Sequence, residues 1–190
     1  LSPRAIRLTG LASCEEKRKY ILGITVNYDS SLSQEGFADC MNTTGQGDWL
    51  QCFREYARYW TNEEHWAAVD RNEKAKQLEE LTLKRSKGEV LTIEEQSELR
   101  YLVSEKNPNI EAADHTHEED TQLPIRGMQV HDDYTMYGHF LFLRKILGWA
   151  GKVRFFFEQE SAMRAACLTA FADRIKEKRC DAFYLMFRKR

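Results

Sequence analysis

Apolar residues recur along the chain with two periods, and each period predicts a different element. Within residues 1–33, a short β-compatible run at 5–12 and a run rich in β-branched and aromatic side chains at 20–28 flank the polar turn 14–18, which predicts a β-hairpin. From about residue 48 to residue 106, apolar positions lie three and four apart, which predicts helices. The chain is therefore expected to be a mixed α/β protein.

The helical stretch carries its own start signals. We expect a first helix over 48–60, capped by Asp48. Two Thr-x-x-Glu capping boxes, at 61–64 and 92–95, predict the starts of two further helices. The tract 107–124 that follows is acidic, poor in large apolar residues and bounded by prolines, which predicts a mobile linker. The middle of the chain is thus expected to be a helical insertion followed by a linker.

The last third alternates between strand and helix patterns. It predicts a strand at 125–130, a helix at 134–150, a strand at 152–157, a helix at 161–178 and a strand at 180–187. The run KVRFFF at 152–157 is continuous and largely apolar, as in a central strand buried on both faces. Right-handed winding through the intervening helices then predicts parallel strands.

The whole order is β-β-β-α-β-α-β, with the helical insertion between the second and third strands. We expect residues 1–33 to form the hairpin, 34–124 the insertion with its linker, and 125–190 the βαβαβ part of the core. This α/β order is similar to the ribonuclease-H-like mixed sheet, in which antiparallel strands are extended by two parallel ones.

The segment GHFLFLRKILGWAGKVRFFFEQESAMRAACLTAF at 138–171 resembles bacterial insertion-sequence transposases, in which a helix leads into an apolar strand that ends in an acid. A Ser/Gly-x-x-Arg-Ala-Ala helix start follows that strand in the family, and SAMRAA at 161–166 matches it. The run KYILGITVNYDSSLS at 19–33 is similar to the family's second core strand. The chain thus resembles a transposase or integrase-like catalytic core of the DDE type, as a fragment or a degenerate member.

The resemblance implies DNA cleavage and strand transfer with Mg²⁺ or Mn²⁺, since two hard cations held by carboxylates activate the attacking oxygen and stabilise the leaving one. Glu158 ends the KVRFFF strand where the family's second acid falls, and Glu160 follows. Both are candidate catalytic residues, and Glu158 is a candidate metal ligand. The predicted first strand has no acid, and Glu15 and Glu16 in the adjacent turn are candidate ligands from the same edge. Alternatively, Glu158 and Glu160 are acids of an ordinary helix N-terminus.

Two other places carry metal-ligand residue types. His115 and His117 precede three acids, and His-Asp-Asp stands at 131–133. A specific metal site needs fixed geometry, which a solvated tract lacks, and we expect the two aspartates to cap the following helix instead. His139 falls on an apolar helix face, where we expect a structural histidine.

Charge is unevenly distributed, although the net charge is −2. Residues 61–133 carry 9 basic and 18 acidic groups, whereas residues 134–190 carry 12 basic and 5 acidic groups. This asymmetry fits either a polyanion-binding face beside a solvated insertion or exposed helix faces alone. The candidate DNA-binding residues are Arg144, Lys145, Lys152, Arg154 and Arg164, with Arg174, Lys176, Lys178 and Arg179 extending the set.

Composition limits the remaining possibilities. The five cysteines are scattered and form no Cys-x-x-Cys pair, which favours reduced thiols. No segment is long and apolar enough to span a bilayer, so we expect a cytoplasmic protein that binds DNA and no membrane, with homo-oligomerisation open. Three functions stay open: an active DNA transposase, a catalytically inactive relative that binds DNA or protein, and an oligomerisation protein without nucleic acid.

Overall fold

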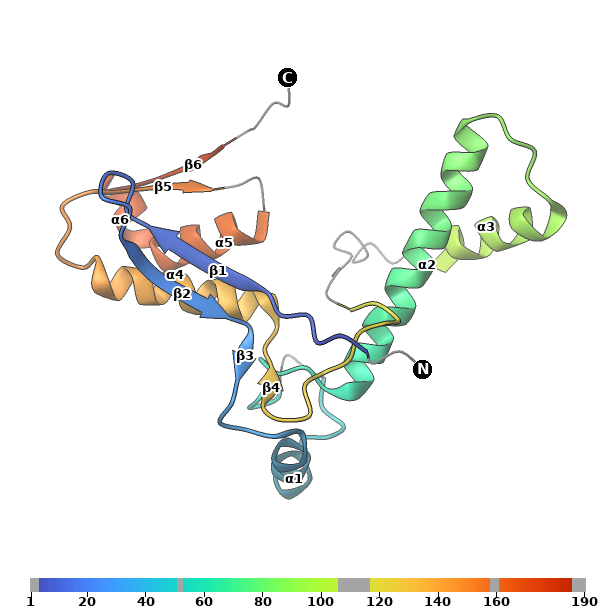
Figure 1. Ribbon diagram of the computed structural model, residues 1–190, viewed down its shortest axis with the longest axis horizontal. Helices are drawn as coiled ribbons and strands as arrows, with labels where there is room; N and C mark the ends of the chain where they lie inside the picture. The colour runs from blue at the N-terminus through green and yellow to red at the C-terminus, as the bar shows by residue number, and fades with distance from the viewer. Residues whose placement is uncertain (1–3, 51–52, 106–116, 158–160, 186–190) are drawn as a thin grey trace. The chain divides into compact units, whose positions relative to one another are not determined.

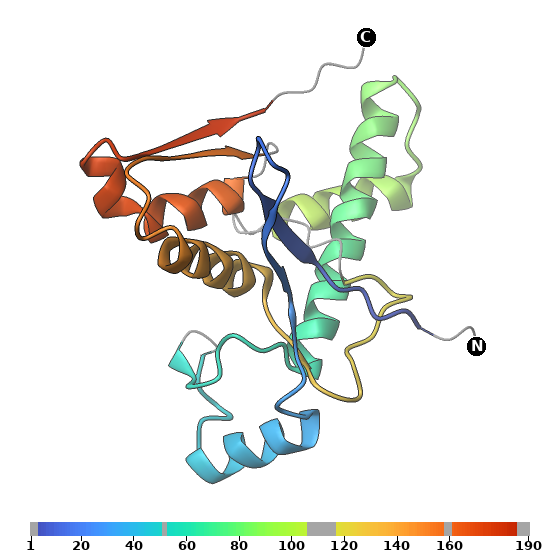
Figure 2. The same ribbon diagram turned by 60° about the vertical axis from the view of Figure 1, so that its left-hand side comes forward.

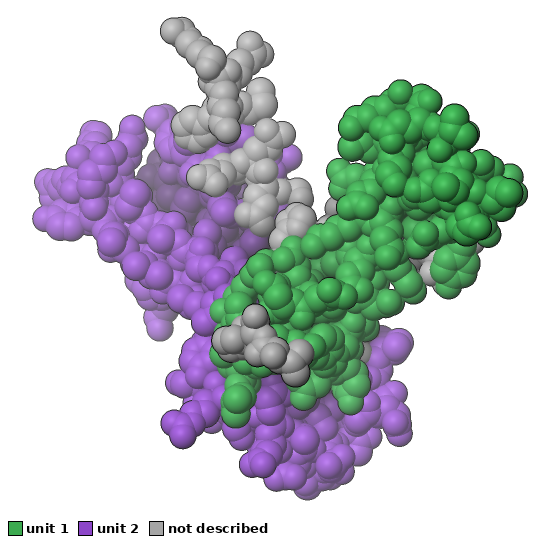
Figure 3. Space-filling model, turned by 45° about the vertical axis from the view of Figure 1, so that its right-hand side comes forward, with its two compact units in different colours: residues 1–7, 60–125 green, residues 8–59, 126–190 purple. Residues whose placement is uncertain are grey.

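The computed structural model describes residues 4–50, 53–105, 117–157 and 161–185, which form a mixed α/β protein (Figure 1). The chain divides into two compact units (Figure 3). Unit 1 contains residues 1–7 and 60–125, and unit 2 contains residues 8–59 and 126–190. The segment predicted as an insertion therefore contributes to both units.

The elements follow the chain in this order: β1 (Gly10–Cys14), β2 (Ile21–Val26), β3 (Tyr28–Asp29), α1 (Gln34–Thr44), α2 (Asn62–Ser86), α3 (Ile93–Glu105), β4 (Met128–Gln129), α4 (Asp132–Ile146), β5 (Val153–Phe157), α5 (Ser161–Ala170), α6 (Ala172–Lys176) and β6 (Cys180–Tyr184). The strands belong to unit 2, as do all helices except α2 and α3.

The described strands form three two-stranded sheets: antiparallel β1–β2, antiparallel β3–β4 and parallel β5–β6. Both views show β5 beside β6, with α5 and α6 connecting them (Figures 1 and 2). The predicted hairpin and the predicted parallel pair are confirmed. The predicted strand at 125–130 is reduced to β4, and the described strands do not join into one mixed sheet.

The core of unit 2 is built around α4. Phe140 of α4 meets Phe155 and Phe157 of β5 edge to face, each at a centroid distance of 5.6 Å, which is a favoured aromatic geometry. The other buried members of this core lie on α4, α5 and β6 or between α5 and α6: Met136, Leu143, Ala166, Cys167, Ala170, Phe171 and Cys180. The predicted helix at 161–178 is two helices, with the break at the buried Phe171.

The prediction that the strand at 152–157 is buried on both faces is wrong. Phe157 is buried, whereas Arg154 and Phe156 are exposed, so β5 has one buried and one open face. On the open face Phe156 stacks on Phe183 of β6 at 5.4 Å, and the two keep 49% and 46% of their surface exposed. An apolar run therefore does not by itself show that both faces are covered.

His139 attaches the β1–β2 hairpin to α4. Its ring is fully buried, with Nε2 2.8 Å from Ser13 Oγ on β1 and Nδ1 2.8 Å from Thr25 Oγ1 on β2. A neutral imidazole has one donor and one acceptor nitrogen, and a hydroxyl can serve either. The expectation of a structural histidine is confirmed. Burial lowers the pKa of His139 from its ordinary value of 6.5, because a dry site disfavours the charged ring.

The predicted helix over 48–60 is wrong. Its described residues form turns, and the helix in this part of the chain is α1, whose N-cap is Ser33 and whose C-cap is Gly45 in the left-handed conformation (φ 65°). Phe37 of α1 packs against the rings of Tyr56 and Tyr59 at 6.1 and 6.2 Å. The apolar spacing of this tract thus serves an aromatic cluster built on turns.

Unit 1 is formed largely by α2 and α3. Both predicted capping boxes are confirmed: Thr61 and Glu64 exchange side-chain to backbone bonds, and so do Thr92 and Glu95. Such boxes satisfy two helix N–H groups that have no partner within the helix. The two helices meet through buried leucines: Leu81, Leu91, Leu99 and Leu102.

The tract predicted as a mobile linker is described from His117 onward, and there the prediction is wrong. His117, Thr121 and Leu123 are 0%, 1% and 7% exposed. The three acids 118–120 stand between His117 and Thr121; Glu118 is half-buried, and Glu119 and Asp120 are exposed. This segment is a packed loop of unit 1, because its few non-acidic side chains point inward.

We predict that unit 2 loses stability in mild acid through His139. Its folded-state pKa is lowered, so its contribution is complete above pH 6.5 and is lost as the pH falls through the folded pKa. Urea unfolding at about pH 7.5 and about pH 5.5 should show a loss of up to about 1.4 kcal/mol per pH unit from this one group. A smaller loss is expected in His139→Gln, and equal losses in both proteins would contradict the assignment.

Candidate functional site

The candidate site is a small cavity in unit 2 beside the N-terminus of α4. Its volume is about 100 Å³, and it is lined by Thr9, Gly10, Leu11, Asp132, Thr135, Met136 and Met163. Met163 lies in the first turn of α5, which begins four residues after β5 ends. The cavity is thus lined in part by the first turn of the helix that follows β5 in the sequence, and ligands of α/β proteins bind outside the carboxyl ends of parallel strands.

Asp132 lines this cavity and is held by two polar residues. Its Oδ1 accepts a hydrogen bond from Asn27 Nδ2 (2.9 Å), and its Oδ2 accepts one from Thr9 Oγ1 (3.2 Å). Asn27 is fully buried, and its Oδ1 accepts from the Thr9 backbone N–H (2.7 Å). The carboxylate is therefore fixed in the first turn of α4, where the helix dipole favours negative charge.

The prediction that Asp132 and Asp133 cap α4 is wrong. The N-cap is His131, which makes no side-chain capping bond, and both aspartates lie inside the first turn. Asp132 instead joins α4 to Asn27 and Thr9, which are more than a hundred residues away in the sequence. Sequence analysis missed Asn27, although an asparagine directly after the β-branched strand β2 is a signal of a polar partner at the strand end.

The two candidate catalytic acids, Glu158 and Glu160, lie outside the described residues. Their neighbours are described: Phe157 is the last residue of β5, and α5 begins at Ser161. The structure therefore describes the strand end and the helix that flank Glu158 in the sequence.

The structure does not bring Glu15 and Glu16 to this cavity. Glu15 follows β1 at the turn, and its carboxylate accepts from the backbone N–H groups of Arg18 (2.6 Å) and Lys17 (3.1 Å), which lower its pKa. The cavity lies at the other end of β1, beside Gly10. Five residues of extended strand separate the two ends by roughly 16 Å, so Glu15 stabilises the turn.

The candidate DNA-binding residues are largely engaged within unit 2. Lys152 and Arg154 both contact Asp181, at 2.8 and 3.5 Å, and Arg144 contacts Asp173 at 2.8 Å. Arg164 lies over the ring of Tyr184 at 5.5 Å, whereas Lys145 is exposed. Each basic group of the ion pairs keeps 44–62% of its side chain exposed, so contact with a phosphate remains sterically open.

Arg174 is not a surface residue. It is 8% exposed, and its guanidinium donates to the carbonyls of Leu147 (3.0 Å) and Gly148 (2.6 Å) at the end of α4. These bonds satisfy helix carbonyls that have no partner within the helix. Arg174 therefore stabilises the fold and is removed from the candidate DNA-binding set.

His117, one of the two histidines weighed as metal ligands, is part of a buried pair in unit 1. Its Nδ1 lies 2.6 Å from Nδ1 of His65 on α2, and its ring packs on Trp60 at 4.0 Å. Burial lowers the pKa of His65, and one of the two Nδ1 atoms donates the proton of this hydrogen bond while the other accepts it. Its partner in the weighed motif, His115, lies outside the described residues. Trp60 itself is buried, with 7% of its surface exposed.

In the part of the chain that the structure describes, no group of three or more His, Cys, Asp or Glu side chains is arranged to hold a metal ion. The described helices also include none that is both long enough and apolar enough to cross a bilayer. No protein-family model, no curated protein and no solved structure matches the chain.

We predict that Asp132→Asn destabilises unit 2 by about 1–3 kcal/mol, because the two bonds from Thr9 and Asn27 lose their charged acceptor. Asp133→Asn is the matched control, since it removes an exposed charge from the same helix turn without those bonds. Urea unfolding of both variants checks the difference. Equal effects would show that only the charge at the helix terminus matters.

Proposed function

We propose that unit 2 belongs to a DNA transposase or integrase-like catalytic core with a ribonuclease-H-like sheet. The observation that carries the proposal is the unit β5–α5–α6–β6, in which parallel strands are joined through helices and Met163 in the first turn of α5 lines a cavity with a fixed carboxylate. The likeness of 138–171 to insertion-sequence transposases covers β5 and α5 of this unit. Local structure and sequence resemblance thus support the same class.

The backbone edges of β1 and β5 that face away from their partner strands are compatible with one larger sheet. Asn27 N donates to Thr9 O (3.0 Å), so by the alternation of an antiparallel ladder the backbone groups of Gly10 and Ala12 point away from β2. On β5, Val153 N donates to Arg179 O, so the backbone groups of the next residue, Arg154, point away from β6. No described strand pairs with either edge.

One further strand between β1 and β5 would join both pairs into a five-stranded mixed sheet. Both pairs already pack on the same core, since Leu11 of β1 and Phe155 of β5 contact the cluster around α4. The family's first acid lies on a central strand of this kind.

Mg²⁺ or Mn²⁺ is part of the proposal through the resemblance and would supply activation of the attacking oxygen and stabilisation of the leaving one. Among the described residues, Asp132 is the carboxylate that lines the cavity, and it does not by itself fit a two-metal centre. The acid expected to contribute is Glu158, which follows β5.

The second candidate is a catalytically inactive relative that binds DNA or protein with the same fold. Two observations favour it: β1 holds no acid, and Glu15 is committed to its own turn. The ion pairs of Lys152 and Arg144 also satisfy part of the basic surface within the protein.

We predict that this chain binds Mn²⁺ and that Glu158→Gln abolishes saturable binding, because a neutral amide replaces a hard anionic ligand. Titration calorimetry measures both proteins. The matched control is Glu177→Gln, an exposed acid near the end of α6 that pairs with Arg179, which should leave binding unchanged.

The outcomes separate the two candidates. Binding that is lost in Glu158→Gln, together with Mn²⁺-dependent scission of a DNA duplex, supports the enzyme. DNA binding with a steep salt dependence but without Mn²⁺ binding or scission supports the inactive relative. A chain that binds neither Mn²⁺ nor DNA contradicts the enzyme and a DNA-binding relative, and leaves a relative that binds protein.

A further inference from the structure

The N-terminal residues 4–7, here called the arm, belong to unit 1 although the chain enters unit 2 at Leu8. Ala5 pairs with Thr121 in an isolated parallel bridge: its N–H donates to Asp120 O (2.8 Å), and its carbonyl accepts from Gln122 N (3.0 Å). The arm is thus a short strand added to the packed loop 117–123.

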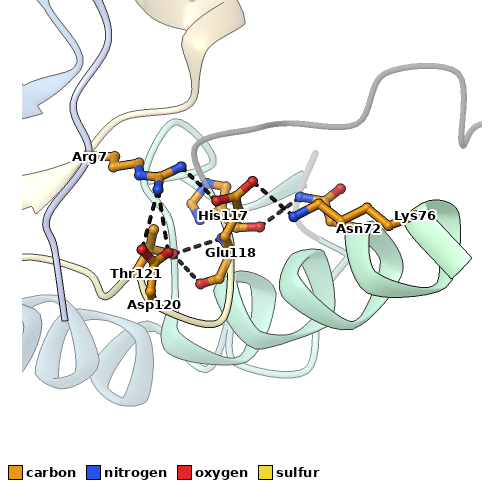
Figure 4. Close-up of polar contacts among 7 residues, drawn as sticks. All are labelled: Arg7, Asn72, Lys76, His117, Glu118, Asp120 and Thr121. Carbon is orange, nitrogen blue, oxygen red and sulfur yellow. Dashed lines mark hydrogen bonds and ion pairs between the residues drawn. The ribbon is translucent and has the colours of Figure 1, made fainter. Parts of the chain in front are cut away.

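Charge complementarity accompanies this backbone pairing. The guanidinium of Arg7 contacts Glu118 at 2.8 Å and Asp120 at 3.4 Å (Figure 4). The guanidinium of Arg4 lies over the ring of Trp66, 4.6 Å from its centroid. Two arginines three residues apart are therefore recognised by two carboxylates and an aromatic face. We call Trp66 and residues 118–122 the arm site.

The arm site is built independently of the arm. The Glu118 carboxylate also forms an ion pair with Lys76 of α2 at 3.0 Å, and the backbone N–H of Glu118 donates to Thr121 Oγ1 (2.9 Å). Asn72 of α2 donates to the His117 carbonyl (2.7 Å), which fixes the loop on the helix (Figure 4). Lys76, followed by Arg7, lowers the pKa of Glu118, so its carboxylate stays charged and ready for a guanidinium.

The arm itself is held loosely. Ile6 and the following Leu8 keep 45% and 44% of their surface exposed, so apolar burial contributes little. The side chains of Arg7 and Asp120 are 41% and 66% exposed, and ion pairs of this kind contribute about 0–1 kcal/mol each. Arg4 lines a cavity of about 510 Å³ together with Trp66, Val69, Asp70, Glu73 and Glu119. The Arg4 side chain therefore has space to move away from the Trp66 ring.

We propose that the arm site accepts the arm of a second copy of this chain, so that two copies associate by exchanging residues 4–7. The exchanged arm makes the same bridge, ion pairs and cation–π contact as the arm of the same chain, and exchange of identical elements is a low-cost route to dimers. Leu8, where the chain passes from one unit to the other, is the hinge. The proposal is independent of the transposase-like function.

Two charge-reversed chains test the exchange. The first carries Arg7→Glu, and the second carries Glu118→Lys with Asp120→Lys. Within each chain the arm and the arm site repel, whereas between the two chains both arm–site pairs attract. We expect each variant alone to be a monomer and their mixture to form a 1:1 heterodimer, measured by light scattering after size exclusion, that salt dissociates.

Two controls accompany the mixture. Arg85→Glu mixed with Glu79→Lys reverses exposed charges on α2 outside the arm site and should give no heterodimer. All three arm and site reversals in one chain restore the attraction within that chain, so this variant should behave as the unaltered protein. A mixture of the two test chains that remains monomeric overturns the proposal.

If the lysine variant does not fold, cross-linking decides the question. Ala5→Cys with Thr121→Cys places two thiols across the bridge. Mild oxidation at rising protein concentration should give a covalent dimer on a non-reducing gel, beyond what Ala5→Cys alone gives. A cross-link confined to the monomer at every concentration would show that the arm stays with its own chain.

Discussion

The hydrogen bonds of His139 to Ser13 and Thr25 attach the β1–β2 hairpin to α4, and the neighbouring Phe140 attaches the β5–β6 pair to the same helix. The two pairs share no described backbone ladder, so their arrangement in unit 2 depends on this one helix. The same helix begins with Asp132, whose bonds to Thr9 and Asn27 tie its first turn to the hairpin. The candidate cavity exists because α4 is fixed at both places.

Local signals predicted local structure well. The capping boxes at Thr61 and Thr92 were recognisable because both partners lie within four residues and the backbone satisfies itself there. Short runs of β-forming residues predicted the hairpin. For the parallel pair, the prediction also used the helical pattern between its two strands. Sequence could also place Glu158 directly after an apolar strand, since that relation is local, whereas Glu158 itself lies outside the described residues.

The errors concern relations between distant residues. The spacing over 48–60 matched a helix, but its rings pack on Phe37 of a helix that sequence analysis did not predict. The acidic composition of 107–124 gave no sign that His117 and Thr121 are buried, because their contacts are with His65 of α2, some fifty residues earlier. Asp132 resembled a cap because its true partners, Thr9 and Asn27, come from the start of the chain. Periodicity cannot report which distant segments meet.

The chain leaves unit 2 after Tyr59 and returns at Arg126, and unit 2 holds this exit and return together. Tyr59 bridges Val130, and His131 N donates to the Arg58 carbonyl at 2.8 Å. The two ends of the segment 60–125 are therefore held by bonds between residues outside that segment. Closing a longer excursion across fixed ends costs only about 0.6 kcal/mol for each doubling of length. Natural selection is thus free to lengthen, shorten or replace the intervening segment while the cavity at α4 keeps its geometry.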